Sequence, residues 1–301
     1  MKVPWPGNRC IICLQEEPLC EEHLIPKSLG GRLTSDFLCL SCNSTLGRDL
    51  ESAAKSDPNI LLAVKAFEKQ IPSLAKAIIE SQPHIGQSKP GSVQGHIKDG
   101  EFRVFPKKLN DGSLIQPTDD ARKTIMKILQ KKGYEEIPIQ KAMSVFDNAP
   151  EDKMVEVIPG HEVVKWSVQN LNIDLSGTQN MDPLIPAKIA YEFMACHIGT
   201  AIYSNFKHLS QVRHCFTNRI MNLEAIQVDR LLSNRHEPFH GICFEGNDPY
   251  AKIQIRLFGS LAFRVHFLHL SIGGPRFVYT HRLDTGEGRV DQINDEGRIR
   301  K

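Results

Sequence analysis

Residues 10–43 read CIICLQEEPLCEEHLIPKSLGGRLTSDFLCLSCN, and this stretch decides the fold of the N-terminal part of the chain. It opens with the pair Cys10 and Cys13 and closes with the pair Cys39 and Cys42. Two Cys-x-x-Cys turns at this separation supply four thiolates, which is typical of a closed tetrahedral zinc site. The sequence therefore predicts one structural zinc ion held by these four cysteines.

The residues between and after the cysteine pairs are more specific than a zinc ribbon requires. Glu22-His23-Leu-Ile-Pro26 is followed by a double glycine, and Asn43 follows the last cysteine directly. Taken together, CIIC…EEHLIPKSLGG…FLCLSCN resembles the HNH endonuclease family, in particular the branch whose ββα-metal finger is pinned by four cysteines. The resemblance covers roughly the first fifty residues.

The resemblance implies a division of work in phosphodiester hydrolysis. His23 would activate a water molecule as general base, while Glu22 and Asn43 would hold one divalent ion, Mg²⁺ or Mn²⁺, at the scissile phosphate. A neutral imidazole suits a base at neutral pH, and carboxylate and amide oxygens suit a hard ion. Gly47, one helical turn after Asn43, offers no further ligand, so millimolar metal dependence is expected.

Four positions leave alternatives open. Asp36 stands nearest to the middle Asn of the family pattern and could brace the loop through its carboxylate. Arg48 is a candidate phosphate contact or an exposed helix charge. Asn43 is also a favoured residue type for a helix N-cap, and His23 could be an ordinary surface histidine.

Composition gives the frame for these motifs. With 301 residues, 41% hydrophobic and 24% charged, the chain is typical of a globular protein that is long enough for two domains. No apolar run reaches membrane-spanning length and no signal segment is evident, so the sequence predicts a cytoplasmic protein. Residues 1–56 are close to neutral, with six Lys and Arg against seven Asp and Glu, so much of any attraction for nucleic acid is expected from elsewhere.

The predicted architecture is α+β, with an N-terminal ββα-metal finger and a larger C-terminal domain that contains an antiparallel sheet. We expect the finger at 1–56, a helical connector and linker at 57–90, and the α+β domain at 91–301. Helices are expected from Asp57-Pro58 and from Asp182-Pro183. Hairpins are expected at 93–105 and 253–267, a linker at 82–92 and a disordered tail from Asp284.

The predicted function is metal-dependent hydrolysis of DNA by an HNH endonuclease, in restriction or phage defence. A homodimer could bring two fingers to the two DNA strands. One alternative is a regulated effector nuclease that a small molecule or protein activates by binding the C-terminal domain. The other is a non-catalytic zinc ribbon that only binds nucleic acid.

Overall fold

The computed structural model describes residues 1–80, 84–88, 91–98, 101–105, 107–108, 114–116, 118–151, 153–165, 170–172, 181–204, 206–233, 237–246, 249–272 and 276–293. The chain packs as two compact units, one made of Met1–Ile78 with Thr178–Lys301 and the other of Ile79–Gly177. Helices accompany sheets whose neighbouring strands are antiparallel, so the fold is α+β as predicted. The units differ from the predicted division at 56 and 90, because residues 1–78 and residues 178–301 pack together.

The N-terminal residues form a hairpin followed by a helix. Strands β1 (Leu19–His23) and β2 (Thr34–Cys39) pair antiparallel, and the short turn η1 (Lys27–Leu29) lies between them. Helix α1 (Leu40–Leu46) follows β2 directly and continues through the wider turn η2 (Gly47–Glu51) into α2 (Ser52–Ser56). A lone two-stranded hairpin is marginally stable in water, so this one depends on what it binds and packs against.

Two helices follow the hairpin segment, α3 (Pro58–Ala66) and α4 (Pro72–Glu80). The Asp57 carboxylate accepts hydrogen bonds from the backbone N–H groups of Asn59 and Ile60, at 2.8 and 3.3 Å. Pro58 occupies the first helical position, where its missing N–H is harmless. The predicted start of this helix is therefore confirmed.

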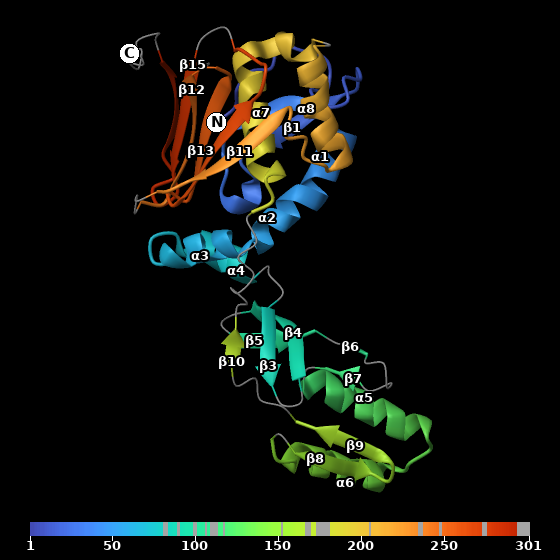
Figure 1. Cartoon of the computed structure of the whole chain (residues 1–301). Coiled ribbons are helices and arrows are strands. Elements are labelled where there is room, and N and C mark those ends of the chain that lie inside the picture. Colours follow the sequence, from blue (N-terminus) through green and yellow to red (C-terminus); the bar gives the residue numbers. More distant parts are fainter. Residues whose placement is uncertain are drawn as a thin grey trace. The chain divides into compact units, whose positions relative to one another are not determined.

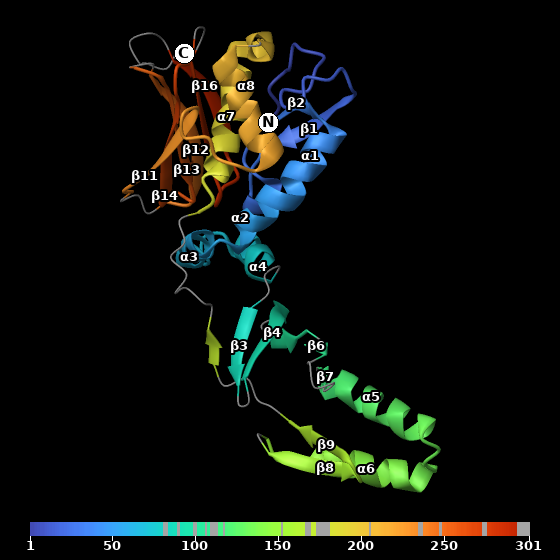
Figure 2. The ribbon, with the colours of Figure 1, turned by 45° about the vertical axis from the view of Figure 1, so that its right-hand side comes forward.

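Helix α7 (Leu184–Ile198) is the centre of the first unit. Figures 1 and 2 both show it between the six-stranded sheet and the hairpin. It is buried along nearly its whole length, and the Asp182 carboxylate accepts from the N–H of Leu184 at 2.9 Å, which confirms the predicted start. The Tyr191 hydroxyl donates to the carbonyl of Ile11 at 2.7 Å, so α7 contacts the first cysteine turn directly.

The chain then passes through η3 (Gly199–Tyr203) and α8 (Lys207–Asn218) into a six-stranded antiparallel sheet. Its strands, in the order β11-β14-β13-β12-β15-β16, are Ile226–Leu231, Leu261–Phe267, Ala251–Leu257, Phe239–Gly246, Arg276–Arg282 and Gly288–Ile293. Alternate residues of β13 are buried, and α7 packs against β13 and β14. The predicted hairpin at 253–267 is confirmed, whereas the predicted disorder from Asp284 is wrong for β16, which pairs with β15.

The second unit has its own elements. A sheet in the order β10-β3-β4-β5 consists of Asn170–Asn172, His84–Ser88, Gly91–Lys98 and Glu101–Val104. Two short hairpins and two helices complete it: β6 (Lys107–Lys108) with β7 (Leu114–Ile115), β8 (Met154–Ile158) with β9 (His161–Val164), α5 (Thr118–Lys131) and α6 (Glu136–Asn148). Strands β4 and β5 confirm the hairpin predicted at 93–105, while β3 lies inside the segment predicted as a linker. The predicted turn residues 99 and 100 lie outside the described residues.

None of the helices in the described part of the chain combines the length and the apolarity that a membrane crossing requires.

Candidate functional site

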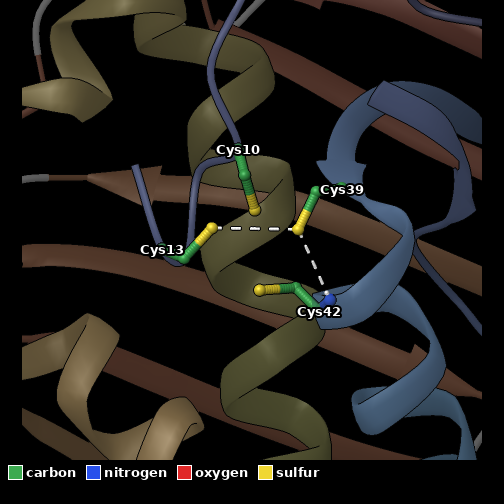
Figure 3. A group of neighbouring side chains, drawn as sticks. All are labelled: Cys10, Cys13, Cys39 and Cys42. Atoms are coloured by element: carbon green, nitrogen blue, oxygen red, sulfur yellow. Dashed lines mark hydrogen bonds between the residues drawn. The ribbon is translucent and has the colours of Figure 1, made fainter. Parts of the chain in front are cut away.

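Four cysteines meet at one end of the hairpin. Cys10 and Cys13 lie in a turn before β1, Cys39 ends β2, and Cys42 lies in the first turn of α1. Their four sulfur atoms all lie within 4.8 Å of one another, and Figure 3 shows them pointing toward a common centre. The Sγ atoms of Cys13 and Cys39 are 3.8 Å apart.

These sulfur positions fit a tetrahedral zinc ion. Zinc binds thiolate sulfur at about 2.3 Å, so two sulfurs of a regular tetrahedron are separated by about 3.8 Å. The Cys42 thiol donates to Cys10, which lowers the pKa of Cys10 to about 5 and raises the pKa of Cys42. The Cys39 sulfur also accepts from the backbone N–H of Cys42 at 3.5 Å and caps α1. Cys10, Cys13, Cys39 and Cys42 would therefore hold the zinc and fasten both ends of the hairpin segment.

Strand β1 divides its acidic and basic side chains between two faces. Glu21 is exposed, Glu22 is buried and His23 is half-buried, as the two-residue period of a strand requires. Glu21 and His23 therefore share one face, and Glu22 points to the other.

A pocket of about 450 Å³ opens on the face that carries His23. Its charged and titratable lining residues are Lys2, Glu21, His23, Lys27 and Arg32. The double glycine after η1 also lines it, and Gly30 has a φ of 90°, in the left-handed region that favours glycine. The pocket thus combines one imidazole, one carboxylate and three basic side chains.

Electrostatics keep the His23 ring neutral at neutral pH. Burial lowers the pKa of His23 below its ordinary value, although the carboxylate of Glu21 opposes this shift. Lys27 lowers the same pKa further through its positive charge. A neutral imidazole that faces an open pocket can accept a proton from a bound water.

On the other face of β1, Glu22 belongs to a buried ion cluster. The Lys188 ammonium of α7 donates to the Glu22 carboxylate at 2.5 Å, to Glu192 at 3.2 Å and to Glu51 at 3.3 Å. Lys188 is 2% exposed, Glu192 0% and Glu22 4%. Burial raises the pKa of Glu192 and of Glu22, whereas the Lys188 charge opposes both shifts.

The comparison with protein families singles out the same part of the chain. Residues 10–59 match the HNH endonuclease family. This HNH segment runs from Cys10 into α3 and contains the four cysteines, Glu22, His23 and Asn43. The match supports nuclease function and makes DNA the implied substrate. No curated protein and no solved structure matches the chain.

Besides zinc, the HNH resemblance implies a divalent ion at Glu22 and Asn43, and this second ion stays a prediction. As folded, Glu22 does not fit it. The Glu22 carboxylate already holds the Lys188 ammonium, and a second cation at the same buried carboxylate would be repelled. The Asn43 amide donates to the Cys20 sulfur at 3.3 Å and to the Glu21 carbonyl at 3.1 Å.

The remaining predicted positions of the HNH segment have simpler surroundings. The helix N-cap is Cys39 rather than Asn43, which lies inside α1. Arg48 is exposed and lies 2.9 Å from the Asp49 carboxylate. Asp36 forms an ion pair with Lys2 at 2.7 Å.

Sequence reasoning missed Lys188 and Glu192 as partners of the HNH segment. A signal for them was present, because they are the only Lys, Arg, Asp or Glu residues of α7 and lie four residues apart. Charged residues at this spacing in an otherwise apolar helix predict a buried ion pair. The Glu22 partner of Lys188 lies 166 residues away, and only the fold brings it close.

Proposed function

We propose that this chain is a metal-dependent HNH endonuclease that hydrolyses phosphodiester bonds of DNA. The observation that supports this most strongly is His23, which belongs to the matched HNH segment and faces an open pocket with basic side chains. Restriction or phage defence is the setting that the family resemblance suggests for such an activity.

In this proposal His23 is the general base. Its neutral ring takes a proton from a water molecule in the pocket, and the resulting hydroxide attacks the phosphorus atom of the scissile phosphodiester. The lowered pKa of His23 keeps the ring ready to accept this proton at neutral pH. A divalent ion, when bound, supplies positive charge that stabilises the phosphorane and the leaving oxygen.

The basic lining of the pocket would attract and orient the phosphate. Among the described residues, Lys27 has no carboxylate within ion-pair distance, so its ammonium is available to a ligand. Lys2 is shared with Asp36 and Glu21, and Arg32 donates to the Gly286 carbonyl. Lys27 is therefore the cation of this pocket that phosphate would bind first.

Cleavage of supercoiled plasmid in Mg²⁺ or Mn²⁺ tests the proposal. We expect nicking by the zinc-loaded native chain and a loss of at least about 10²-fold in His23→Ala, because a general base contributes on this scale. His214→Ala is the matched control, since His214 is exposed on α8 and lies outside the pocket.

Equal metal-dependent cutting by the native chain and His23→Ala would contradict the role of His23. A folded, zinc-loaded native chain that cuts in neither metal would favour the regulated effector over a constitutive nuclease. Linear product at early times would indicate that two HNH segments act together.

A further inference from the structure

The cluster around Lys188 has the composition of an occupied cation site. An ammonium group has three N–H donors, and Lys188 directs one to each of three carboxylates, on Glu22, Glu51 and Glu192. The carboxylates come from β1, from η2 and from α7 itself, so the cation joins three elements. Glu51 is the member nearest to solvent, with 22% of its side chain exposed.

The positive charge of Lys188 is fixed by its surroundings. Burial alone would lower the pKa of Lys188, but the charges of Glu192, Glu22 and Glu51 outweigh it and raise this pKa above its ordinary value. A buried ammonium that loses its carboxylate partners strongly lowers the stability of the folded protein, and so does a buried carboxylate that loses its cation. The ammonium and the Glu22 carboxylate therefore stabilise each other's charged forms.

A divalent ion at Glu22 would need access to water and to the substrate phosphate, and the surroundings of Glu22 do not provide it. Mg²⁺ and Mn²⁺ bind a few protein oxygens at about 2.1 Å and complete their shells with water and substrate phosphate. Glu22 is 4% exposed and faces away from the pocket of His23, so neither water nor phosphate in that pocket reaches it. Among the described residues, Glu21 supplies the single carboxylate of the pocket lining.

We propose that Lys188 is the resident cation of Glu22, so that Glu22 does not hold the divalent ion of the nuclease reaction. Glu22 instead bonds Lys188 and so fixes β1 against α7. This inference rests on the proposed function only in naming the reaction, the DNA hydrolysis for which His23 is the base. Whether Glu22 binds the Lys188 ammonium or a metal ion is a question of binding, and it is tested without measuring DNA cleavage.

The experiment compares the native chain, Glu22→Gln and Glu21→Gln, each zinc-loaded and full-length. Free Mn²⁺ is followed by electron paramagnetic resonance during a titration, and thermal unfolding is recorded in the absence of Mn²⁺. We expect Glu22→Gln to keep the native Mn²⁺ isotherm within about twofold. The same variant should shift Tm by roughly 5 °C, since it removes one charge from a buried ion cluster. Glu21→Gln removes the same charge from the exposed face and should leave Tm nearly unchanged.

Lys188→Gln supplies the complementary measurement. With the ammonium removed, Glu22, Glu51 and Glu192 lose their cation, and we expect this variant to bind one more Mn²⁺ per chain than the native protein. The double variant Lys188→Gln/Glu22→Gln should lose that additional ion. If Lys188→Gln does not fold, Glu22→Gln still decides the matter, because there the ammonium keeps two carboxylate partners.

The proposal is overturned if folded Glu22→Gln binds Mn²⁺ at least about tenfold more weakly than the native chain, because Glu22 is then a ligand of the ion. It is also overturned if Glu22→Gln leaves Tm unchanged, or if folded Lys188→Gln gains no Mn²⁺. A chain that cuts no DNA but gives the expected Mn²⁺ and Tm results would contradict a constitutive nuclease and leave the Lys188 assignment standing.

Discussion

At the scale of single residues, His23 sets the pH dependence of the proposed reaction. Burial lowers the pKa of His23 below 6.5, and a general base works only above its pKa. The initial nicking rate at low DNA concentration should therefore rise with pH below about 6.5 and stay level at higher pH. Rates measured across this range at constant ionic strength check the expectation.

Glu21 provides the control for that profile. Its carboxylate raises the pKa of His23 against the effect of burial, so Glu21→Gln should move the rising limb to lower pH. A midpoint above pH 6.5 in the native chain would contradict the assignment of the base. A midpoint that Glu21→Gln leaves in place would contradict the coupling between the two side chains.

The same residues show what strand periodicity can and cannot predict. Alternation along β1 was sufficient to separate Glu22 from His23, and the structure has them on opposite faces. The partner of Glu22 could not be inferred, because Lys188 is distant in sequence and the resemblance supplied a metal ion for the same carboxylate. Local pattern specifies the direction of a side chain, whereas its partner depends on packing.

At the scale of elements, zinc should stabilise the hairpin of β1 and β2. Only two strands make up this sheet, and the four cysteines join the turn before β1 to the end of β2 and the start of α1. We expect one zinc per native chain by atomic emission and less than half of that in Cys42→Ser. The same substitution should lower Tm by roughly 10 °C, since a structural zinc site contributes directly to folding.

Cys243→Ser is the matched control for zinc binding. Cys243 lies on β12, outside the four-cysteine cluster, so its loss should leave the zinc content unchanged. Full zinc content in purified Cys42→Ser would show that the cluster does not need its fourth thiolate.

Elements with strong local signals were predictable, and elements defined by pairing were not. The Asp-Pro pairs at 57–58 and 182–183 mark the starts of α3 and α7 in the sequence itself. Strand β16 lies in a Gly-rich, charged stretch whose composition favours disorder, yet its backbone pairs with β15 from Arg276↔Ile293 to His281↔Gly288. Such a strand exists because a neighbouring strand offers hydrogen bonds, which composition does not reveal.

At the scale of the whole molecule, the first unit is assembled from two separated parts of the sequence. Residues 1–78 and 178–301 share it, while residues 79–177 form the second unit between them in the chain. A division into consecutive domains could not anticipate this, because α7 presents one side to the HNH segment and another to the sheet. The ion cluster of Lys188 and the Tyr191 contact with Ile11 are consequences of that assembly.

His240 joins the sheet to the HNH segment in the same unit. Its Nε2 atom lies 2.9 Å from the Leu29 carbonyl and donates to it, and its Nδ1 atom accepts from the Phe258 N–H at 3.3 Å. These bonds require the neutral ring, because a protonated ring has no acceptor. Burial lowers the pKa of His240 to about 4.

The His240 pKa makes the stability of this unit depend on pH. Between pH 6.5 and about 4 the unfolded chain binds a proton that the folded ring does not, so the free energy of unfolding falls as the pH falls. His240 alone should account for a loss of about 2 kcal/mol between pH 7 and pH 5. Urea unfolding at the two pH values, compared between the native chain and His240→Gln, should show a smaller loss in the variant.

Fluorescence can restrict this measurement to the first unit. Trp5 packs against Phe37 of β2, so a Trp166→Phe background leaves a reporter next to the HNH segment. His214→Gln is the control, because this histidine is exposed on α8 and is distant in sequence from His240 and Leu29. An equal loss of stability in the native chain and His240→Gln would mean that other groups produce the pH dependence. The contact between the sheet and Leu29 would then not depend on the protonation of His240.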